Sequence, residues 1–134
     1  MAVLQLSLDR NNSPRWHYEV ARDLAMLRQK GVLILGSGNM VHNLRLMNWA
    51  NPDQTYDWAA EMNAKFKEYI LGGDYKKLIE YPSLGKGAML SVPTPEHFLP
   101  MLYVLGAKEE TEQIKFFNDK TVMGSVSMTS FKIS

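Results

Sequence analysis

The chain has 134 residues, a formal net charge of +1 and no cysteine. This length suffices for one domain with a buried core, and the near-neutral charge argues against a surface built for nucleic acid. The lack of cysteine excludes disulfides, thiolate metal ligands and a cysteine nucleophile from this chain, and no apolar run or signal-peptide pattern indicates a membrane or export route, so we expect a cytoplasmic protein.

The first forty residues predict a strand, a helix and a second strand. Residues 3–8 alternate apolar and polar side chains, as a strand does. Ser13-Pro14 predicts a helix start, with an N-cap followed by proline at the first helical position, and Gly31 predicts its end. Residues 32–35 form a short apolar run that is typical of a strand buried on both faces. This order favours a right-handed parallel crossover.

The remainder of the chain predicts three more helices and two more strands. We expect helices over residues 56–71, 74–79 and 94–106, and strands over residues 114–117 and 122–133. No repeat, low-complexity tract or linker interrupts the pattern. Residues 1–134 are therefore interpreted as a single α/β unit with a central, mostly parallel sheet flanked by helices.

The first candidate for chemistry is His42. It follows the glycine-rich turn 36–39, at the carboxyl end of the expected buried strand, where open α/β sheets bind their ligands. Asn43 and Arg45 add a hydrogen-bonding amide and a cation beside it. Imidazole is the commonest metal ligand and the usual acid/base near neutral pH. The alternative is a histidine that only satisfies loop backbone.

The second candidate is His97, in the first turn of the helix expected from Thr94-Pro95. The positive end of a helix dipole disfavours a charged imidazolium there, and a neutral imidazole can bind metal or accept a proton. Glu96 lies beside it. The alternative is a capped helix start with a partly exposed histidine. The third histidine, His17, is expected to be a surface or half-buried side chain.

Around these motifs the chain resembles the LigB-type class III extradiol ring-cleaving dioxygenases, especially the 4,5-DOPA dioxygenase group. The similar segments follow one another in the same order over nearly the whole chain: residues 3–8, 24–38, 42–45, 93–100, 103–107 and 124–128. The resemblance is to the second half of the catalytic subunit of that family.

This resemblance implies an active site. The family uses a mononuclear non-haem metal, Fe(II) for turnover, and zinc can occupy the same site. A catecholic ring binds the metal, dioxygen binds beside it, and the ring opens next to a hydroxyl. The resemblance places His42 and His97 in this site as metal ligands or acid/base catalysts, with either assignment open. Asn43, Arg45 and Glu96, which lie beside these histidines in the sequence, are the candidates for substrate binding.

One departure from the family limits this expectation. The first half of the family subunit supplies further metal-binding histidines, and this sequence does not contain that half. We therefore expect an incomplete site that needs an N-terminal half or a partner subunit. The chain is interpreted as a fragment, as one half of a split enzyme, or as a non-catalytic remnant that oligomerises and binds a metal or small ligand. Half a sheet would expose strand edges and favour a homo-oligomer.

Overall fold

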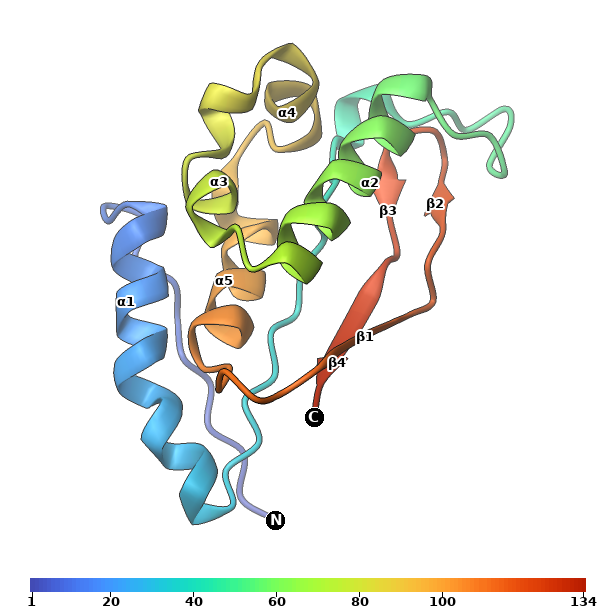
Figure 1. Cartoon of the computed structure of the whole chain (residues 1–134). Helices are drawn as coiled ribbons and strands as arrows, with labels where there is room; N and C mark the ends of the chain where they lie inside the picture. The colour runs from blue at the N-terminus through green and yellow to red at the C-terminus, as the bar shows by residue number, and fades with distance from the viewer.

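Helices make up most of the ordered structure, and two short antiparallel strand pairs lie at one side of them (Figure 1). The computed structural model describes all residues, 1–134. The helices are α1 (Pro14–Leu24), α2 (Asp57–Gly72), α3 (Tyr75–Ile79), α4 (Lys86–Ser91) and α5 (Leu99–Gly106), with 3₁₀ turns η1 (Ala25–Lys30), η2 (Leu44–Leu46), η3 (Tyr81–Leu84) and η4 (Pro95–His97). The strands are β1 (Ile114–Phe117), β2 (Thr121–Val122), β3 (Val126–Ser127) and β4 (Ser130–Ile133).

The helix boundaries predicted for the first half of the chain are confirmed. The Ser13 hydroxyl accepts a hydrogen bond from the backbone N–H of Trp16, and Pro14 opens α1. The helix continues as η1 and ends at Gly31, whose φ of 80° is the left-handed conformation that glycine adopts most easily. Gly73, with a φ of 70°, ends α2 in the same way.

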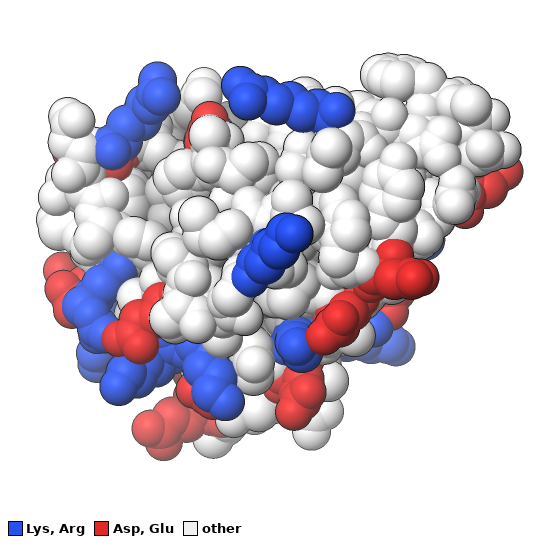
Figure 2. All heavy atoms as spheres, turned by 90° about the horizontal axis from the view of Figure 1, so that it is seen from above, with Lys and Arg blue, Asp and Glu red and all other residues white.

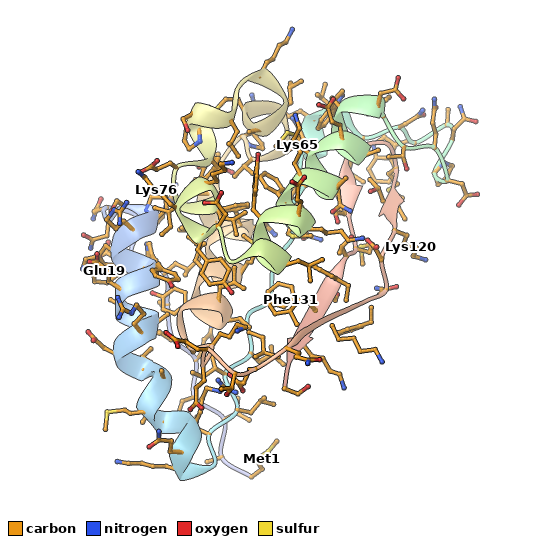
Figure 3. The ribbon with its side chains drawn as sticks, viewed as in Figure 1. Met1, Glu19, Lys65, Lys76, Lys120 and Phe131 are labelled. Carbon is orange, nitrogen blue, oxygen red and sulfur yellow. The ribbon has the colours of Figure 1, made fainter.

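The hydrophobic core is formed by side chains of α2, α3, α4 and α5. Phe66 of α2 is fully buried, and its ring lies 5.2 Å from the ring of Phe98, next to α5. The helix α1 packs closely on α5, since a Cβ added at Gly106 would lie 2.7 Å from the Cβ of Ala21. Phe131 of β4 adds a partly buried ring on the side of the strand that faces the helices (Figure 3).

The helix expected over residues 94–106 is interrupted. The turn η4 covers Pro95–His97, and α5 starts only at Leu99. The reason is Pro100, which has no N–H to donate to the preceding turn, so a continuous α-helix through this point would lose a hydrogen bond. The break leaves His97 in a 3₁₀ turn rather than in the first turn of a long helix.

The single strand expected over residues 122–133 is also wrong. A tight turn at Met123 and Gly124, with φ values of 50° and 77°, folds β2 back on β3, and positive φ at both positions suits such hairpin turns. The chain then continues into β4, which pairs antiparallel with β1. Each sheet has two strands.

The two strands expected over residues 3–8 and 32–35 belong to no sheet. Both segments carry no regular secondary structure, and Leu4, Leu33 and Leu35 are 96%, 83% and 78% exposed. The expectation that residues 32–35 are buried on both faces is therefore wrong for this chain. A parallel strand is covered only when neighbouring strands and crossover helices flank it, and the other strands here pair among themselves.

The mixed helix-and-strand class is confirmed, whereas a central parallel sheet is not formed. None of the helices combines the length and the apolar character that a membrane-spanning segment needs. On the face shown in Figure 2, basic and acidic side chains lie close together along one side, and most of the remaining surface is uncharged. That face therefore carries no broad patch of one sign.

Candidate functional site

The fold brings His42 and His97 into contact. Their ring centroids lie 3.7 Å apart, and the ring planes differ by 14°, so the two imidazoles are stacked. His42 is half-buried and His97 is exposed. Two side chains that are far apart in sequence therefore form one imidazole pair at the surface of the protein.

The backbone around His42 is held from two sides. On one side the His42 N–H donates to the carbonyl of Ser91, at the end of α4, over 2.8 Å. On the other side the Asn43 N–H donates to the Ser125 carbonyl, and the Ser125 hydroxyl donates to the Asn43 carbonyl over 2.7 Å. Ser127 donates its N–H to the carbonyl of Val41. These bonds fix the position of His42 between α4 and β3.

The backbone of His97 is held by the same loop. The Asn39 N–H donates to the His97 carbonyl over 2.8 Å, and the Asn39 side-chain amide donates to the Ser127 carbonyl over 2.7 Å. This approach requires glycine at position 38, because a Cβ there would lie 2.1 Å from the His97 carbonyl oxygen. A Cβ at Gly36 would lie 2.5 Å from the Pro100 carbonyl oxygen. The glycine-rich turn thus lets the two histidine-bearing segments touch.

The electrostatic setting favours a neutral His42. Burial lowers the pKa of His42, and the neighbouring His97 lowers it further, while the negative charge of Glu96 opposes both. The pKa of Glu96 is itself held below its ordinary value, first by its own backbone N–H and also by the Thr94 hydroxyl. A neutral imidazole offers a lone pair to a metal or a proton.

The three side chains expected to bind substrate lie in different settings. Asn43 is buried, and its side-chain amide donates to the carbonyl of Leu90 over 2.8 Å. Arg45 lies in η2 and is exposed, and Glu96 lies in η4 and is exposed. Asn43 thus contacts backbone in this structure, and the two charged side chains face solvent.

Two buried oxygens beside His42 have no hydrogen-bond partner within the chain. They are the side-chain oxygen atoms Oδ1 of Asn43 and Oγ of Ser91. Buried polar atoms are hydrogen-bonded in the great majority of cases, and each exception needs a reason. Both residues belong to the segments that hold His42.

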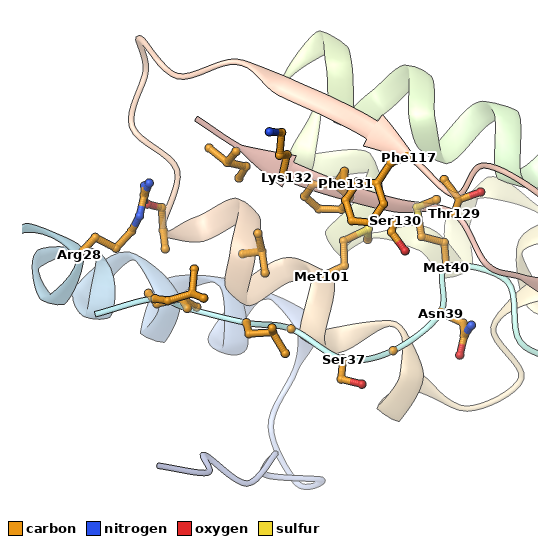
Figure 4. Close-up of a pocket in the computed structure, with 18 of the residues that line it drawn as sticks. Arg28, Ser37, Asn39, Met40, Met101, Phe117, Thr129, Ser130, Phe131 and Lys132 are labelled. Carbon is orange, nitrogen blue, oxygen red and sulfur yellow. The ribbon is translucent and has the colours of Figure 1, made fainter. Parts of the chain in front are cut away.

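A groove runs from Arg28 to His97 along one side of α5, with a volume of about 780 Å³ (Figure 4). We call it the α5 groove. Residues 31–40 form one wall, α5 contributes Met101 and Val104 to the floor, and residues 129–133 of the β4 segment form the opposite wall. Because Asn39 contacts His97, the groove ends at the imidazole pair.

The imidazole pair offers only part of a metal site. No group of three or more His, Cys, Asp or Glu side chains lies close enough together to hold a metal ion. Non-haem iron sites of the facial type use two histidines and a carboxylate and leave positions open for substrate and oxygen. The lone pairs of the two imidazoles lie in nearly parallel ring planes, so the stacked pair fits such a ligand set with one imidazole on the metal and the other beside it.

His17 differs from its expected setting. It is fully buried rather than surface or half-buried. Its Nδ1 lies 2.9 Å from the hydroxyl of Tyr103, and its Nε2 lies 3.0 Å from the carbonyl of Asp9. Both ring nitrogens are therefore occupied, and this histidine joins α1, α5 and the end of the N-terminal segment.

The residues that hold the pair together were not identified from the sequence. Asn39, Ser91, Ser125 and Ser127 position the two histidines through backbone contacts. A serine in a short strand or at a helix end carries no pattern that separates it from a surface residue. Asn39 could have been identified from its position. It is a polar residue that follows a glycine-rich turn and precedes a histidine, at the end of a strand where a ligand is expected.

Several proteins similar to this chain carry the same name. The chain is 40% identical over 134 residues to a protein named 4,5-DOPA dioxygenase extradiol from Escherichia coli K12, and this match covers 98% of the chain and 49% of that protein. Proteins of the same name from Beta vulgaris and Portulaca grandiflora are 30% and 32% identical to the chain, and these matches also cover 98% of the chain and 49% of each protein. The chain thus spans about half the length of the curated relatives it matches. No family model matches the chain.

A solved structure has the same fold. It is the crystal structure of an uncharacterized protein from Escherichia coli K12, with a TM-score of 0.86 and 40% identity, over 93% of this chain and 52% of that one. With the sequence matches, it confirms the resemblance stated from the histidine motifs. The chain matches the C-terminal half of the LigB-type extradiol dioxygenases, in the group of proteins named 4,5-DOPA dioxygenase extradiol.

Proposed function

We propose that this chain supplies the two-histidine part of a metal-dependent extradiol dioxygenase site, which opens a catecholic ring with dioxygen. The observation that carries the proposal is the stacking of His42 and His97 at 3.7 Å. The relatives named 4,5-DOPA dioxygenase extradiol support the reaction class. The unused backbone groups of residues 33–38 along the groove, which leads to His97, support a site completed by another polypeptide segment.

We assign different roles to the two histidines. His97 is exposed at the end of the α5 groove, where ligands from another segment can approach, and we assign it to the metal. His42 is half-buried and has a lowered pKa, so at neutral pH it can accept a proton from a catechol hydroxyl. Fe(II) is the proposed metal for turnover, and zinc suits the same imidazole donors. The bound metal would supply open positions at which the catechol and dioxygen meet.

The surrounding side chains have supporting roles in the proposal. Arg45 provides an exposed cation close in sequence to His42, which suits a carboxylate on the substrate. Glu96 provides a carboxylate next to His97. Asn43 is bound to the Leu90 carbonyl, so we propose that it acts on substrate only through the position of His42.

The proposal is tested by complementation. The chain is co-expressed with the half of the Escherichia coli relative that it does not match, and the complex is loaded with Fe(II) and assayed for opening of the DOPA ring. We expect His42→Ala to lower the rate by about 10²–10⁴-fold with metal retained. We expect His97→Ala to lower the bound iron as well as the rate. Met89→Ala, an exposed position on α4, serves as the control.

Two results contradict the proposal. One is an iron-loaded complex that never opens a catecholic ring. The other is a ring-opening rate that neither histidine substitution changes.

The alternative function is a non-catalytic module that oligomerises and binds a metal or a small ligand. The exposed apolar segments 3–6 and 32–35 are the observation that favours it, because contiguous exposed apolar surface commonly marks an interface. A purified chain that forms a stable dimer and holds no stoichiometric metal would support this alternative.

A further inference from the structure

One wall of the α5 groove is a strand-like segment without partners. No backbone hydrogen bond within the chain uses the N–H or C=O groups of residues 33–38. The same holds for residues 2–8. Backbone groups in apolar segments are normally paired, and an extended segment satisfies them by joining a sheet.

The opposite wall of the groove also has a free edge. The strand β4 pairs with β1 alone, and Figure 4 shows β4 nearer than β1 to residues 31–40. The two walls therefore resemble two strands of one sheet with a space between them, and Met101 and Val104 of α5 lie below this space. Apolar side chains of a strand between the walls would be covered by α5 on that side.

The size of the groove fits a short strand. The rise of a strand, the spacing between strands and the spacing between layers give roughly 160 Å³ for each residue. The groove volume of about 780 Å³ therefore corresponds to about five strand residues, which is the usual length of a strand.

We propose that the α5 groove binds a β-strand of a polypeptide equivalent to the half of the relatives that this chain does not match. The strand inserts between residues 32–36 and β4, and its end lies beside His97. The solved relative supports this occupant, because the fold of this chain recurs there with a TM-score of 0.86 as only 52% of a longer chain. The inference rests on the proposed function for the identity of this partner.

The docking is tested by binding rather than by activity. The full chain, with an affinity tag, is mixed with the unmatched half of the Escherichia coli relative, and the complex is measured by size-exclusion chromatography with light scattering and by titration. We expect a one-to-one complex. Leu35→Lys should weaken it at least tenfold, because Leu35 is 78% exposed in the groove wall and would be buried by the inserted strand. Met89→Lys, at a 48% exposed position on α4, should leave the affinity unchanged.

Backbone substitutions separate strand pairing from a merely apolar contact. Leu33→Pro and Ile34→Pro each remove an N–H that the chain itself does not use. Neighbouring N–H groups of a strand point to opposite edges, so at least one of the two substitutions should weaken the complex at least tenfold. Leu33→Thr and Ile34→Thr, which keep the N–H, should weaken it less. Circular dichroism of each variant checks that the helices remain.

Three outcomes overturn the inference. The first is that the wild-type chain forms no complex, and the second is a complex whose affinity Leu35→Lys does not change. The third is a homodimer that occupies the groove and does not bind the other half. A complex that depends on the groove but opens no ring would contradict the proposed function alone. Ring opening by a complex that tolerates every groove substitution would contradict the docking alone.

Discussion

Residues 32–38 and residues 39–43 are consecutive in the chain, and they differ sharply in how their backbones are bonded. The first segment has no backbone hydrogen bond beyond Val32, whereas the second is bonded to α4, β3 and the His97 turn. The first segment is made of apolar and small residues, and the second carries Asn39, His42 and Asn43. The comparison shows that the local sequence makes both segments extended, and that the presence of a partner decides whether the backbone is paired.

The largest difference in stability should appear when one side chain is truncated in the packed core and one in the open groove wall. Phe66 is fully buried and packs against Phe98, so Phe66→Ala should lower the free energy of unfolding by about 3–5 kcal/mol. Leu35→Ala should change it by less than about 0.5 kcal/mol, because the side chain is already exposed. Urea denaturation of both variants checks the contrast. Equal losses would show that the groove wall is packed in solution.

Gly38 lies where the two segments join. Gly38→Ala would place a Cβ 2.1 Å from the His97 carbonyl oxygen, and the resulting shift should cost about 2–3 kcal/mol and separate the imidazole pair. Gly72→Ala is the matched control, since nothing lies within 4 Å of its Cβ position inside α2. That change should leave stability unchanged or raise it by up to about 1 kcal/mol. Thermal unfolding of both variants measures the difference in stability. A Gly38→Ala chain as stable as wild type would contradict the close approach of Gly38 to the His97 carbonyl.

The N-terminal segment offers a third test. Residues 2–8 have no backbone hydrogen bond, and His17 holds the end of the segment at Asp9. His17→Phe keeps an aromatic ring but leaves the Tyr103 hydroxyl and the Asp9 carbonyl without their partner. We expect a loss of about 1–3 kcal/mol, as for other buried polar groups left unpaired. Denaturant unfolding measures this loss. Trp16→Phe, at a 38% exposed neighbouring position, should cost less. A His17→Phe chain as stable as wild type would contradict the anchoring role.

The smallest effect should come from the ion pair at the Arg28 end of the groove. The hydrogen bonds from Arg28 lower the pKa of Glu112 from 4.5 to about 2. Because the folded-state pKa is depressed, the pair stabilises the fold above pH 4.5 and loses this contribution as the pH falls from 4.5 towards 2. At pH 7, Glu112→Gln should cost about 1 kcal/mol.

The pH series for this ion pair is measured by urea unfolding of wild type and Glu112→Gln at several pH values. The difference between the two should shrink steadily below pH 4.5. Glu19→Gln, on the outward face of α1 (Figure 3), is the control and should show little difference at any pH. A difference that stays constant down to pH 3 would contradict the assigned role of Arg28.

The sequence was sufficient for features that depend on neighbouring residues. The start of α1 at Ser13-Pro14 and the end of its continuation η1 at Gly31 follow from capping and from glycine geometry. The interruption between His97 and Leu99 follows from Pro100, which has no N–H to donate. The residues around it predict a continuous helix, so the effect of this proline has to be considered separately. Features of this kind are local, and the residues that cause them are visible in the sequence.

Features that depend on distant partners were harder to predict. The apolar run 32–35 predicts a buried strand, but burial needs neighbouring strands that these residues cannot specify alone. The full burial of His17 depends on Tyr103, which lies in another helix. The contact between His42 and His97 was expected only from the resemblance to the dioxygenase family, since neither spacing nor periodicity brings two such distant rings together.

Amide hydrogen exchange of residues 32–38 tests the central claim most directly. The claim is that this chain is one part of a two-part fold whose open wall pairs when the other part is present. In the chain alone the amides of residues 33–38, which have no partner within the chain, should exchange as fast as an exposed loop, and addition of the unmatched half of the Escherichia coli relative should slow them by at least about 100-fold. Equal exchange with and without that half, or strong protection in the chain alone, would contradict the account.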